Sequence, residues 1–515
     1  MLNRLLQATT GTLLLVLLPL TGVAQPTEPY RPGDCRGLRA QTTDTRAIHT
    51  AERMHEKKGA PAHCRVTGQI RPEVGFEVRL PDDWNGRFLM LGNGGFGGAI
   101  QAVIQGGFAP YLRAGFAVAA TDTGHDADRQ PLASFGTDRQ KVIDFAYRAV
   151  HVTTRAAKDL IAAYYDSGPE LSYFRGGSTG GRQGLMAAQR FPGDYDGILA
   201  GFPVLDQTNH HLASIHRTQA MEKAPIHMNQ LPTLAEHVYA RCDGGDGVED
   251  GLIAEPLRCP FDLAADLPRC NDGIARPSCF TEGQIGTLQA LYGDVKSQGE
   301  TIMPGLPVGA SAQGRVVGPF PPYVGSGWAP YLVNQDAKPF RLQGSASFLR
   351  YMAFDTPRPE YDWRDFDVDT DPGRIQWIRT VLDATDPDLS AFRAQGGKLL
   401  LYHGWADSGP NPRMSIRYYE TVLDTLGAST TDLFRLFMIP GMFHGGGIGN
   451  PSVNAFDALR AWVETDTPPD RLTISYHEDG EVVRTRPACP YPQVARPMGS
   501  GPTDDAANFE CVAPR

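Results

Sequence analysis

The sequence lacks long basic runs and carries a formal net charge of −10 at pH 7 over 515 residues. Nucleic-acid-binding proteins gather lysine and arginine on one surface, so we expect no nucleic-acid partner. Beyond the N-terminal region, no segment reaches the roughly 18 unbroken apolar residues of a membrane helix, so we expect no membrane span. The sequence also has no internal repeats. Nothing in these absences predicts the oligomeric state.

Glycine and proline are abundant, with 57 and 41 residues, but stay below the roughly 25–30% that marks low-complexity chains. Hydrophobic residues make up 41% and charged residues 21%, which argues against disorder and allows a sizeable core. At roughly 100–200 residues per domain, the length allows two or three domains. We expect a globular protein that is rich in turns and loops.

Residues 1–24 have the features of a secretory signal peptide in the expected order. Arg4 supplies a positive charge, residues 11–18 form a short apolar run, and Gly22 and Ala24 are small residues at a cleavage point. The run is too short to span a membrane comfortably. A buried N-terminal helix is the alternative. The signal peptide explains the order of features better and predicts a secreted or periplasmic protein.

Eight cysteines fall into four pairs of sequence neighbours. An exported chain meets an oxidising environment, where an even number of cysteines indicates disulfides. A zinc site is the alternative, but the chain has no CxxC motif or nearby histidine pair to support it. Eight cysteines allow about 105 pairings, so the sequence alone does not fix the connectivity. The pairs we expect are Cys35 with Cys64, Cys242 with Cys259, Cys270 with Cys279, and Cys489 with Cys511.

Short apolar runs alternate with amphipathic stretches over residues 66–200, and buried runs return after residue 396. This alternation is typical of an α/β fold with a mainly parallel sheet. The helical spacing of apolar residues predicts helices over 140–165 and 183–189. The predicted strands are 76–80, 88–91, 116–120, 171–174, 398–402 and 434–438.

Residues 205–395 interrupt this pattern, with four of the cysteines, many prolines and a concentration of aromatic residues. The economical interpretation is one α/β domain with a large insertion. We expect the α/β domain to comprise residues 25–204 and 396–515, and the inserted domain to comprise residues 205–395.

Gly176, Ser178 and Gly180 match the G-x-S-x-G motif between a predicted strand and a predicted helix. This motif forms a sharp turn that exposes the serine hydroxyl at the carboxyl edge of an α/β-hydrolase sheet. The flanking glycines permit the strained backbone and close packing of the helix. An ordinary turn is the alternative, but the strand and helix on either side favour a nucleophile at Ser178.

A serine needs a base to accept its proton, and in α/β-hydrolases an acid and then a histidine follow it in the chain. Asp407 follows the predicted strand 398–402, and His444 follows the predicted strand 434–438. His444 would accept the Ser178 proton and return it to the leaving alcohol, while Asp407 would hold the imidazole tautomer. Each residue alone is compatible with an ordinary loop position. The order of all three favours a catalytic triad.

Residues 92–98, Gly-Asn-Gly-Gly-Phe-Gly-Gly, follow a predicted buried strand. Their backbone N–H groups can turn towards Ser178, so we expect Gly94 or Gly95, with the Thr179 amide, to form the oxyanion hole. The glycines also satisfy the dinucleotide pattern G-x-G-x-x-G. We reject that alternative because the protein looks exported and no clear ribose-binding acid ends a strand at the expected distance.

Residues 243–252 form an acidic, glycine-rich loop bracketed by Cys242 and Cys259. Carboxylates at the first, fourth and eighth positions suit a hard cation, although the spacing differs from that of an EF-hand. A solvated acidic turn is the alternative. The predicted Ca²⁺ ligands are the side chains of Asp243, Asp246 and Asp250 and the carbonyls of Val248 and Leu252.

With these motifs, the sequence resembles the tannase and feruloyl esterase family, which also includes enzymes that hydrolyse mono(2-hydroxyethyl) terephthalate. The resemblance implies an α/β-hydrolase fold with an inserted lid domain that binds Ca²⁺ and shapes the acyl pocket. It also implies the triad Ser178, Asp407 and His444 and the five calcium ligands above. The resemblance covers nearly all of the mature chain, with its specific stretches at 92–95, 172–174, 176–184, 189–192, 196–198, 242–253, 348–351, 403–407 and 440–446.

One departure concerns the cysteines that this family usually has beside the catalytic serine and histidine, where they form a disulfide. Here those positions are Gly177 and Gly445. Both partners are absent together, so no thiol is left unpaired. We expect packing alone to position the two catalytic loops.

The prediction is therefore a secreted serine esterase that acts on esters of aromatic acids of the feruloyl, galloyl or terephthaloyl type. Its expected partner is a small-molecule aromatic ester, and its expected cofactor is structural Ca²⁺. An esterase for small aliphatic or polyester-derived esters is one alternative. A catalytically silent binding protein on the same fold is another, which the intact Ser178, Asp407 and His444 oppose.

Overall fold

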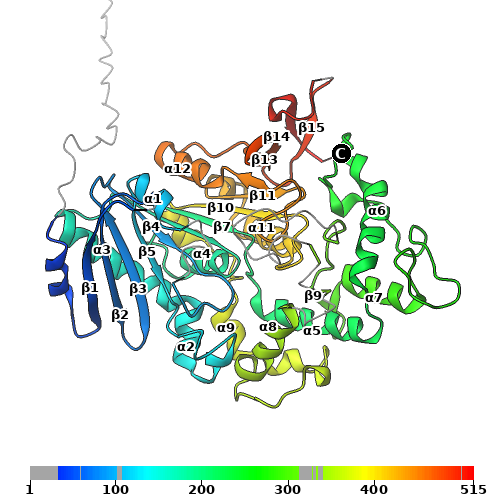
Figure 1. Ribbon diagram of the computed structural model, residues 1–515, viewed down its shortest axis with the longest axis horizontal. Coiled ribbons are helices and arrows are strands. Elements are labelled where there is room, and N and C mark those ends of the chain that lie inside the picture. Colours follow the sequence, from blue (N-terminus) through cyan, green and yellow to red (C-terminus); the bar gives the residue numbers. More distant parts are fainter. Residues whose placement is uncertain are drawn as a thin grey trace, which may run out of the picture.

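The computed structural model describes residues 33–57, 59–100, 107–311, 327–328, 332–333, 340–499 and 501–514 (Figure 1). The predicted signal peptide, residues 1–24, lies outside this range. Within these residues, no helix is both long and apolar enough to cross a membrane.

A nine-stranded sheet forms the centre of the protein, in the order β1-β2-β3-β5-β4-β6-β7-β10-β11. The first strands pair antiparallel as far as β3 with β5, and all later neighbours pair parallel. This mixed sheet between helices is the predicted α/β-hydrolase fold. The strands are β1 Arg46–Met54, β2 His63–Ile70, β3 Val74–Pro81, β4 Arg87–Leu91, β5 Ala117–Thr121, β6 Leu171–Gly177, β7 Gly197–Gly201, β10 Lys398–Gly404 and β11 Phe434–Ile439.

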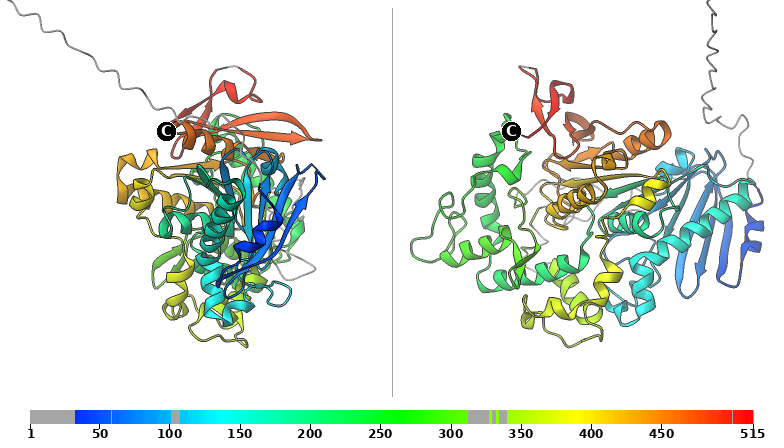
Figure 2. Two further views of the ribbon diagram at one scale, coloured as in Figure 1. Left: turned by 90° about the vertical axis from the view of Figure 1, so that its left-hand side faces the viewer. Right: turned by 180° about the vertical axis from the view of Figure 1, so that it is seen from behind.

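Helices cover both faces of the sheet (Figure 2). Successive strand side chains point to opposite faces, so Met90 of β4 joins one apolar cluster while Leu89 and Leu91 join the other. The first cluster is completed by α3 (Ala149–Tyr165), α4 (Thr179–Arg190) and α11 (Pro412–Leu426). The second is completed by α1 (Ala109–Arg113) and α12 (Ala455–Thr465).

The predicted strands all appear at or within a few residues of their expected positions. The predicted 140–165 helix is divided into α2 (Arg139–Ile143), a π-helical turn (Asp144–Arg148) and α3. The predicted helix at 183–189 is part of α4, which begins directly after Ser178.

The described part of segment 205–395 is mainly helical and lies between β7 and β10 in the chain. One apolar cluster, which includes Leu212 and Phe348, packs it against Phe135 and Phe145, and a second cluster lies within the segment itself. Its elements are α5 Gln207–Lys223, α6 Leu231–Cys242, α7 Glu282–Tyr292, the hairpin β8 Val295–Ser297 and β9 Glu300–Met303, α8 Phe340–Phe348, α9 Trp377–Leu382 and α10 Ser390–Ala394.

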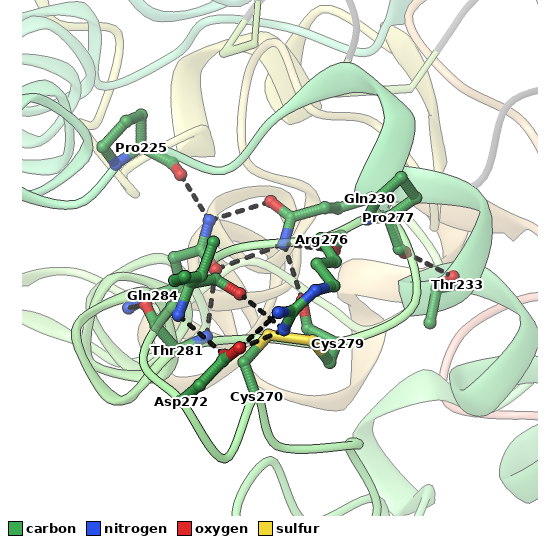
Figure 3. The surroundings of a disulfide bond; sticks show 11 residues. Pro225, Gln230, Thr233, Cys270, Asp272, Arg276, Pro277, Cys279, Thr281 and Gln284 are labelled. Atoms are coloured by element: carbon green, nitrogen blue, oxygen red, sulfur yellow. Dashed lines mark hydrogen bonds and ion pairs between the residues drawn. A yellow bond between two sulfur atoms is a disulfide. The ribbon is translucent and has the colours of Figure 1, made fainter.

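All eight cysteines are paired, and the four bridges join the sequence neighbours that we expected. Figure 3 shows the Cys270–Cys279 bridge between α6 and α7. There the amide of Gln230 donates to the Cys279 carbonyl at 2.8 Å and receives a hydrogen bond from Gln284 at 2.8 Å. The bridge closes a loop within the connection, and the hydrogen bond between the two amides joins the start of α6 to the start of α7.

After β11 the chain forms small antiparallel sheets beside that strand, and α12 lies between β12 and β13 in the chain. The bridge between Cys489 and Cys511 joins the end of one sheet to the other. The strands are β12 Pro451–Val453, β13 Leu472–Glu478 and β14 Glu481–Ala488 in one sheet, and β15 Val494–Pro497 and β16 Phe509–Val512 in the other.

Candidate active site

Ser178 occupies the turn between β6 and α4, with φ 59° and ψ −122°. Positive φ is rare for residues other than glycine, and such strain gathers at functional sites. The flanking glycines let the start of α4 pack closely on this turn, because a Cβ at Gly176 would lie within 2.8 Å of the backbone of Gly180. The sequence thus forces a sharp turn that presents the serine side chain at the carboxyl edge of the sheet.

Ser178, His444 and Asp407 form a continuous hydrogen-bonded chain. His444 Nε2 lies 3.0 Å from Ser178 Oγ, and His444 Nδ1 lies 2.9 Å from Asp407 Oδ2. Asp407 follows β10 and His444 lies in the loop after β11, so neighbouring parallel strands bring the two residues to one edge. The sequence placed both residues after these strands, and the structure brings all three side chains together.

The Asp407 carboxylate is fully buried. It accepts hydrogen bonds from the Gly409 amide at 2.6 Å and from His403 Nε2 at 3.2 Å as well as from His444. Burial alone would raise the pKa of Asp407, but His444 and the hydrogen bond from His403 outweigh it and lower that pKa to about 2. The carboxylate is therefore ionised at every ordinary working pH.

His403 is a member of this site whose role the sequence did not reveal. Its ring is fully buried, with Nδ1 2.8 Å from Ser415 Oγ and Nε2 facing Asp407. With the proton on Nε2, His403 donates to Asp407 while Ser415 donates to Nδ1. Only the fold brings the start of α11, which carries Ser415, against the end of β10.

The predicted oxyanion loop packs directly on the start of α4. A Cβ at Gly92 would lie 2.8 Å from Gly180 Cα, and Thr179 Oγ1 donates to the Gly95 carbonyl at 2.6 Å. Thr179 is the first residue of α4, where backbone N–H groups have no partner within the helix. Gly94, Gly95 and Thr179 are therefore close to one another beside Ser178.

An aromatic stack extends from this loop into segment 205–395. Phe96 stacks on His211 of α5, with ring centroids 5.6 Å apart, and His211 stacks on Phe348 of α8 at 4.5 Å. Burial lowers the pKa of His211 to about 3, so this ring is neutral. From α8, Arg341 donates to the carbonyl of Gly409, two residues after Asp407. The helical segment thus contacts both the glycine loop and the loop that carries Asp407.

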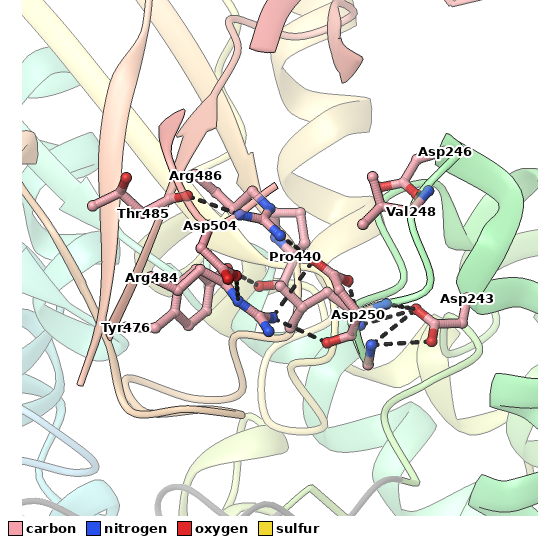
Figure 4. A network of polar contacts seen from close by, with 12 residues as sticks. Asp243, Asp246, Val248, Asp250, Pro440, Tyr476, Arg484, Thr485, Arg486 and Asp504 are labelled. Carbon is pink, nitrogen blue, oxygen red and sulfur yellow. Dashed lines mark hydrogen bonds and ion pairs between the residues drawn. The ribbon is translucent and has the colours of Figure 1, made fainter. Parts of the chain in front are cut away.

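The acidic loop lies beside β14 and the His444 loop (Figure 4). Asp250 accepts a hydrogen bond from Arg486 of β14 at 2.6 Å, and Asp243 accepts one from the Gly251 amide at 3.0 Å. Burial, together with the carboxylates of Asp250 and Asp243, raises the pKa of Asp246 to about 6. Across the described residues, no three His, Cys, Asp or Glu side chains are grouped as metal ligands.

The remaining predicted ligands of this loop are backbone carbonyls. Val248 donates its amide to Asp246 at 2.9 Å, which keeps the turn closed. The Leu252 side chain packs against Gly441, where it leaves no room for a Cβ. The acidic loop therefore supports the backbone that leads to His444.

The protein matches the family described as tannase and feruloyl esterase over residues 59–512. Mono(2-hydroxyethyl) terephthalate hydrolase of Piscinibacter sakaiensis is 32% identical over 520 residues, covering 88% of this chain and 85% of that protein. Feruloyl esterase B of Aspergillus niger is 30% identical over 483 residues, covering 87% and 86%. The crystal structure of feruloyl esterase B from Aspergillus oryzae aligns with a TM-score of 0.81 at 26% identity, covering 93% of this chain and 99% of that chain.

The fold and the extent of these matches define the protein as a carboxylic ester hydrolase of the α/β-hydrolase fold. Within that class, the chain belongs to the tannase and feruloyl esterase family.

Proposed function

We propose that the protein is a secreted serine esterase that works through an acyl-enzyme on Ser178. Ser178 Oγ attacks the ester carbonyl carbon while His444 Nε2 accepts the hydroxyl proton. The tetrahedral intermediate collapses, its bond to the alcohol oxygen breaks, and His444 returns the proton to the departing alcohol. Water then attacks the acyl group with His444 as base, which releases the acid and restores Ser178. The observation that carries this proposal is the chain of hydrogen bonds from Ser178 to Asp407.

In this mechanism Asp407 holds His444 with Nδ1 protonated and stabilises the imidazolium that forms during attack. Its ionised, buried carboxylate suits that role. We propose backbone N–H groups of Gly94 or Gly95 and of Thr179 as donors to the oxyanion. The contact between Thr179 and Gly95 supports this assignment because it holds the two segments in register.

We propose an ester of an aromatic acid as the substrate. The stack of Phe96, His211 and Phe348 is largely buried and joins the glycine loop to segment 205–395, so it fixes the wall beside the site. The relatives named as a mono(2-hydroxyethyl) terephthalate hydrolase and as a feruloyl esterase support the same class of substrate. Small aliphatic esters are the second possibility.

We also propose residues 25–204 and 396–515 as the catalytic domain, with 205–395 as a lid and residues 1–24 as a signal peptide. The four disulfides support export, since such bridges persist in oxidising compartments. We also propose that Gly177 and Gly445 stand in place of the cysteine pair that the family resemblance implies beside the triad.

We propose that the acidic loop binds a structural Ca²⁺ through Asp243, Asp246, Asp250 and the carbonyls of Val248 and Leu252. The oxygen-only donor set fits this cation. Burial and, after it, the neighbouring carboxylates raise the pKa of Asp246, and a divalent ion would relieve the repulsion among these carboxylates. Arg486 and Arg484 already neutralise part of the charge on Asp250. The ion would hold the loop that packs against Gly441 and would take no part in the chemical steps.

The test is hydrolysis of methyl ferulate, methyl gallate and mono(2-hydroxyethyl) terephthalate by the native protein and by Ser178→Ala. We expect turnover of at least one ester by the native protein and a loss of about 10⁴-fold or more in kcat in the variant. Comparable rates in the two proteins would refute the serine mechanism. Faster turnover of methyl acetate than of all three aromatic esters would support the aliphatic alternative.

A further inference from the structure

The ring of Phe202 fills the space between Gly177 and Gly445. A Cβ on Gly177 would lie 2.6 Å from Phe202 Cζ and 2.7 Å from Cε2, and a Cβ on Gly445 would lie 3.3 Å from Cζ. Side chains at both positions would therefore compete with the ring for one volume. The two glycines flank Ser178 and His444, so the ring lies between the two catalytic loops.

Phe202 is linked to one catalytic loop by its ring and to the other by its neighbours in the chain. Its ring packs edge-on against His444, with centroids 4.9 Å apart and planes at 71°. Its neighbours in the chain bind the Ser178 turn, since Ser178 N donates to the Gly201 carbonyl at 3.0 Å and Val204 N donates to the Ser178 carbonyl at 3.3 Å. The residue therefore connects the serine turn to the histidine ring.

The backbone of Phe202 has φ 34°, in the region that favours glycine. A bulky side chain at positive φ is an outlier that persists only where the surrounding structure holds it. Here the Phe202 amide donates to the Tyr402 carbonyl at 2.7 Å, and Tyr402 packs edge-on against the ring at 5.8 Å. These contacts to β10 direct the ring towards His444.

We propose that Phe202 is the positioning residue that sets the distance between Ser178 and His444, in place of a covalent link between their loops. This inference rests on the proposed serine mechanism. The ring restricts His444 on one face while Asp407 orients it from Nδ1. Gly177 and Gly445 are glycines because the ring needs their space. Gly445 also has φ 82°, which favours glycine independently.

The first test replaces the ring and separates kcat from KM. We expect Phe202→Ala to lower kcat for p-nitrophenyl acetate by about tenfold to a hundredfold, because displacing a catalytic base by about 1 Å has effects of that size. KM should change little, since the small acyl group does not use the lid. Phe202→Leu should lose less than Phe202→Ala. The control is Phe456→Leu in α12. It removes an aromatic ring whose ring contacts are with Tyr111, Phe116 and Tyr173, and it should keep the native kcat.

The second test restores the constraint by other means. In the Phe202→Ala background, Gly177→Cys with Gly445→Cys has the space for a disulfide, and oxidation should recover at least half of the lost log kcat relative to the same variant reduced. Comparing oxidised and reduced forms of one variant cancels the strain of a cysteine at position 445. With Phe202 present, the same cysteine pair should fail to form the bridge or should displace the ring.

Two results would overturn the inference: native kcat in folded Phe202→Ala, or a bridge that forms in the Phe202→Ala background without raising kcat. If Phe202→Ala does not fold, the kcat of folded Phe202→Leu decides the question, and a native value would overturn the inference. The proposed function fails separately, if Ser178→Ala keeps the native rate. A loss of activity in Ser178→Ala with native kcat in Phe202→Ala would refute only the positioning role.

Discussion

The Asp407 carboxylate accepts three hydrogen bonds, from His444, from His403 and from the Gly409 amide. A buried carboxylate with this many donors stays ionised and fixed in place. The sequence indicated Asp407 because it follows a strand in the order Ser, Asp, His. It did not indicate the role of His403, because that role depends on a contact with Ser415, which only the packing of α11 creates.

We predict that His403→Ala lowers kcat more than it changes KM. Removing a hydrogen bond to a charged group costs about 1.5–3 kcal/mol, which is about tenfold to a hundredfold in rate if Asp407 loses its orientation. His403→Gln, which can still donate an N–H group, should lose less. Steady-state kinetics with p-nitrophenyl acetate measure the effect. Unchanged kcat in His403→Ala would show that Asp407 does not need this donor.

At the scale of elements, the carboxyl ends of the central strands assemble the site. Asp122 directly follows β5 and accepts hydrogen bonds from the amides of Gly75 at 2.9 Å and Gly124 at 2.8 Å. The Asp122 carbonyl also accepts from Gly98 in the glycine-rich loop at 2.9 Å. Burial raises the pKa of Asp122 to about 7, although these amides lower it.

A raised carboxyl pKa makes stability depend on pH in a definite direction. The folded state favours protonated Asp122, so its contribution is complete below the ordinary value of 3.8 and is lost as pH rises through about 7. We predict that the free energy of unfolding falls between about pH 4 and pH 7, by up to about 1.4 kcal/mol per pH unit from this group, and levels off above that range. Urea unfolding of Asp122→Asn should show a flatter profile. Exposed Asp83→Asn is the control, and identical profiles for Asp122→Asn and the native protein would contradict the assignment.

The elements with strong apolar patterns were predictable from the sequence, as β4, β5, β6, β10 and β11 show. Strand β7 was not, because Gly-Ile-Leu-Ala-Gly contains small residues and is too short to show a period. The position of Phe202 after β7 was equally hidden, since its role depends on glycines that are distant in sequence. The sequence shows glycine at positions 177 and 445, but only the fold shows that the Phe202 ring lies between them.

At the scale of the whole molecule, the acidic loop connects segment 205–395 to the C-terminal strands. Asp250 pairs with Arg486 of β14, and Tyr476 of β13 donates to the carbonyl of Pro440 at 3.3 Å (Figure 4). Pro440 begins the loop that leads to His444. Stability of this junction is therefore coupled to the geometry of the proposed active site.

We predict that a chelator lowers the melting temperature and that added Ca²⁺ restores it. An ion present at a hundred times its Kd stabilises the folded state by about 2.7 kcal/mol. Asp246→Asn should abolish the calcium dependence, whereas Asp272→Asn, an exposed change in the same segment, should keep it. Differential scanning calorimetry with and without EDTA measures both. A melting temperature that does not respond to EDTA or Ca²⁺ would refute the calcium site.

The central claim, that Ser178 is the nucleophile activated by His444, is tested most directly by covalent labelling. A fluorophosphonate transfers its phosphonyl group to an activated serine and releases fluoride, and peptide mass spectrometry locates the group. We predict one phosphonyl group per chain, on the peptide that contains Ser178, with no label in Ser178→Ala and labelling slowed by orders of magnitude in His444→Ala. Labelling at another residue, or equal rates in the native protein and His444→Ala, would contradict the account.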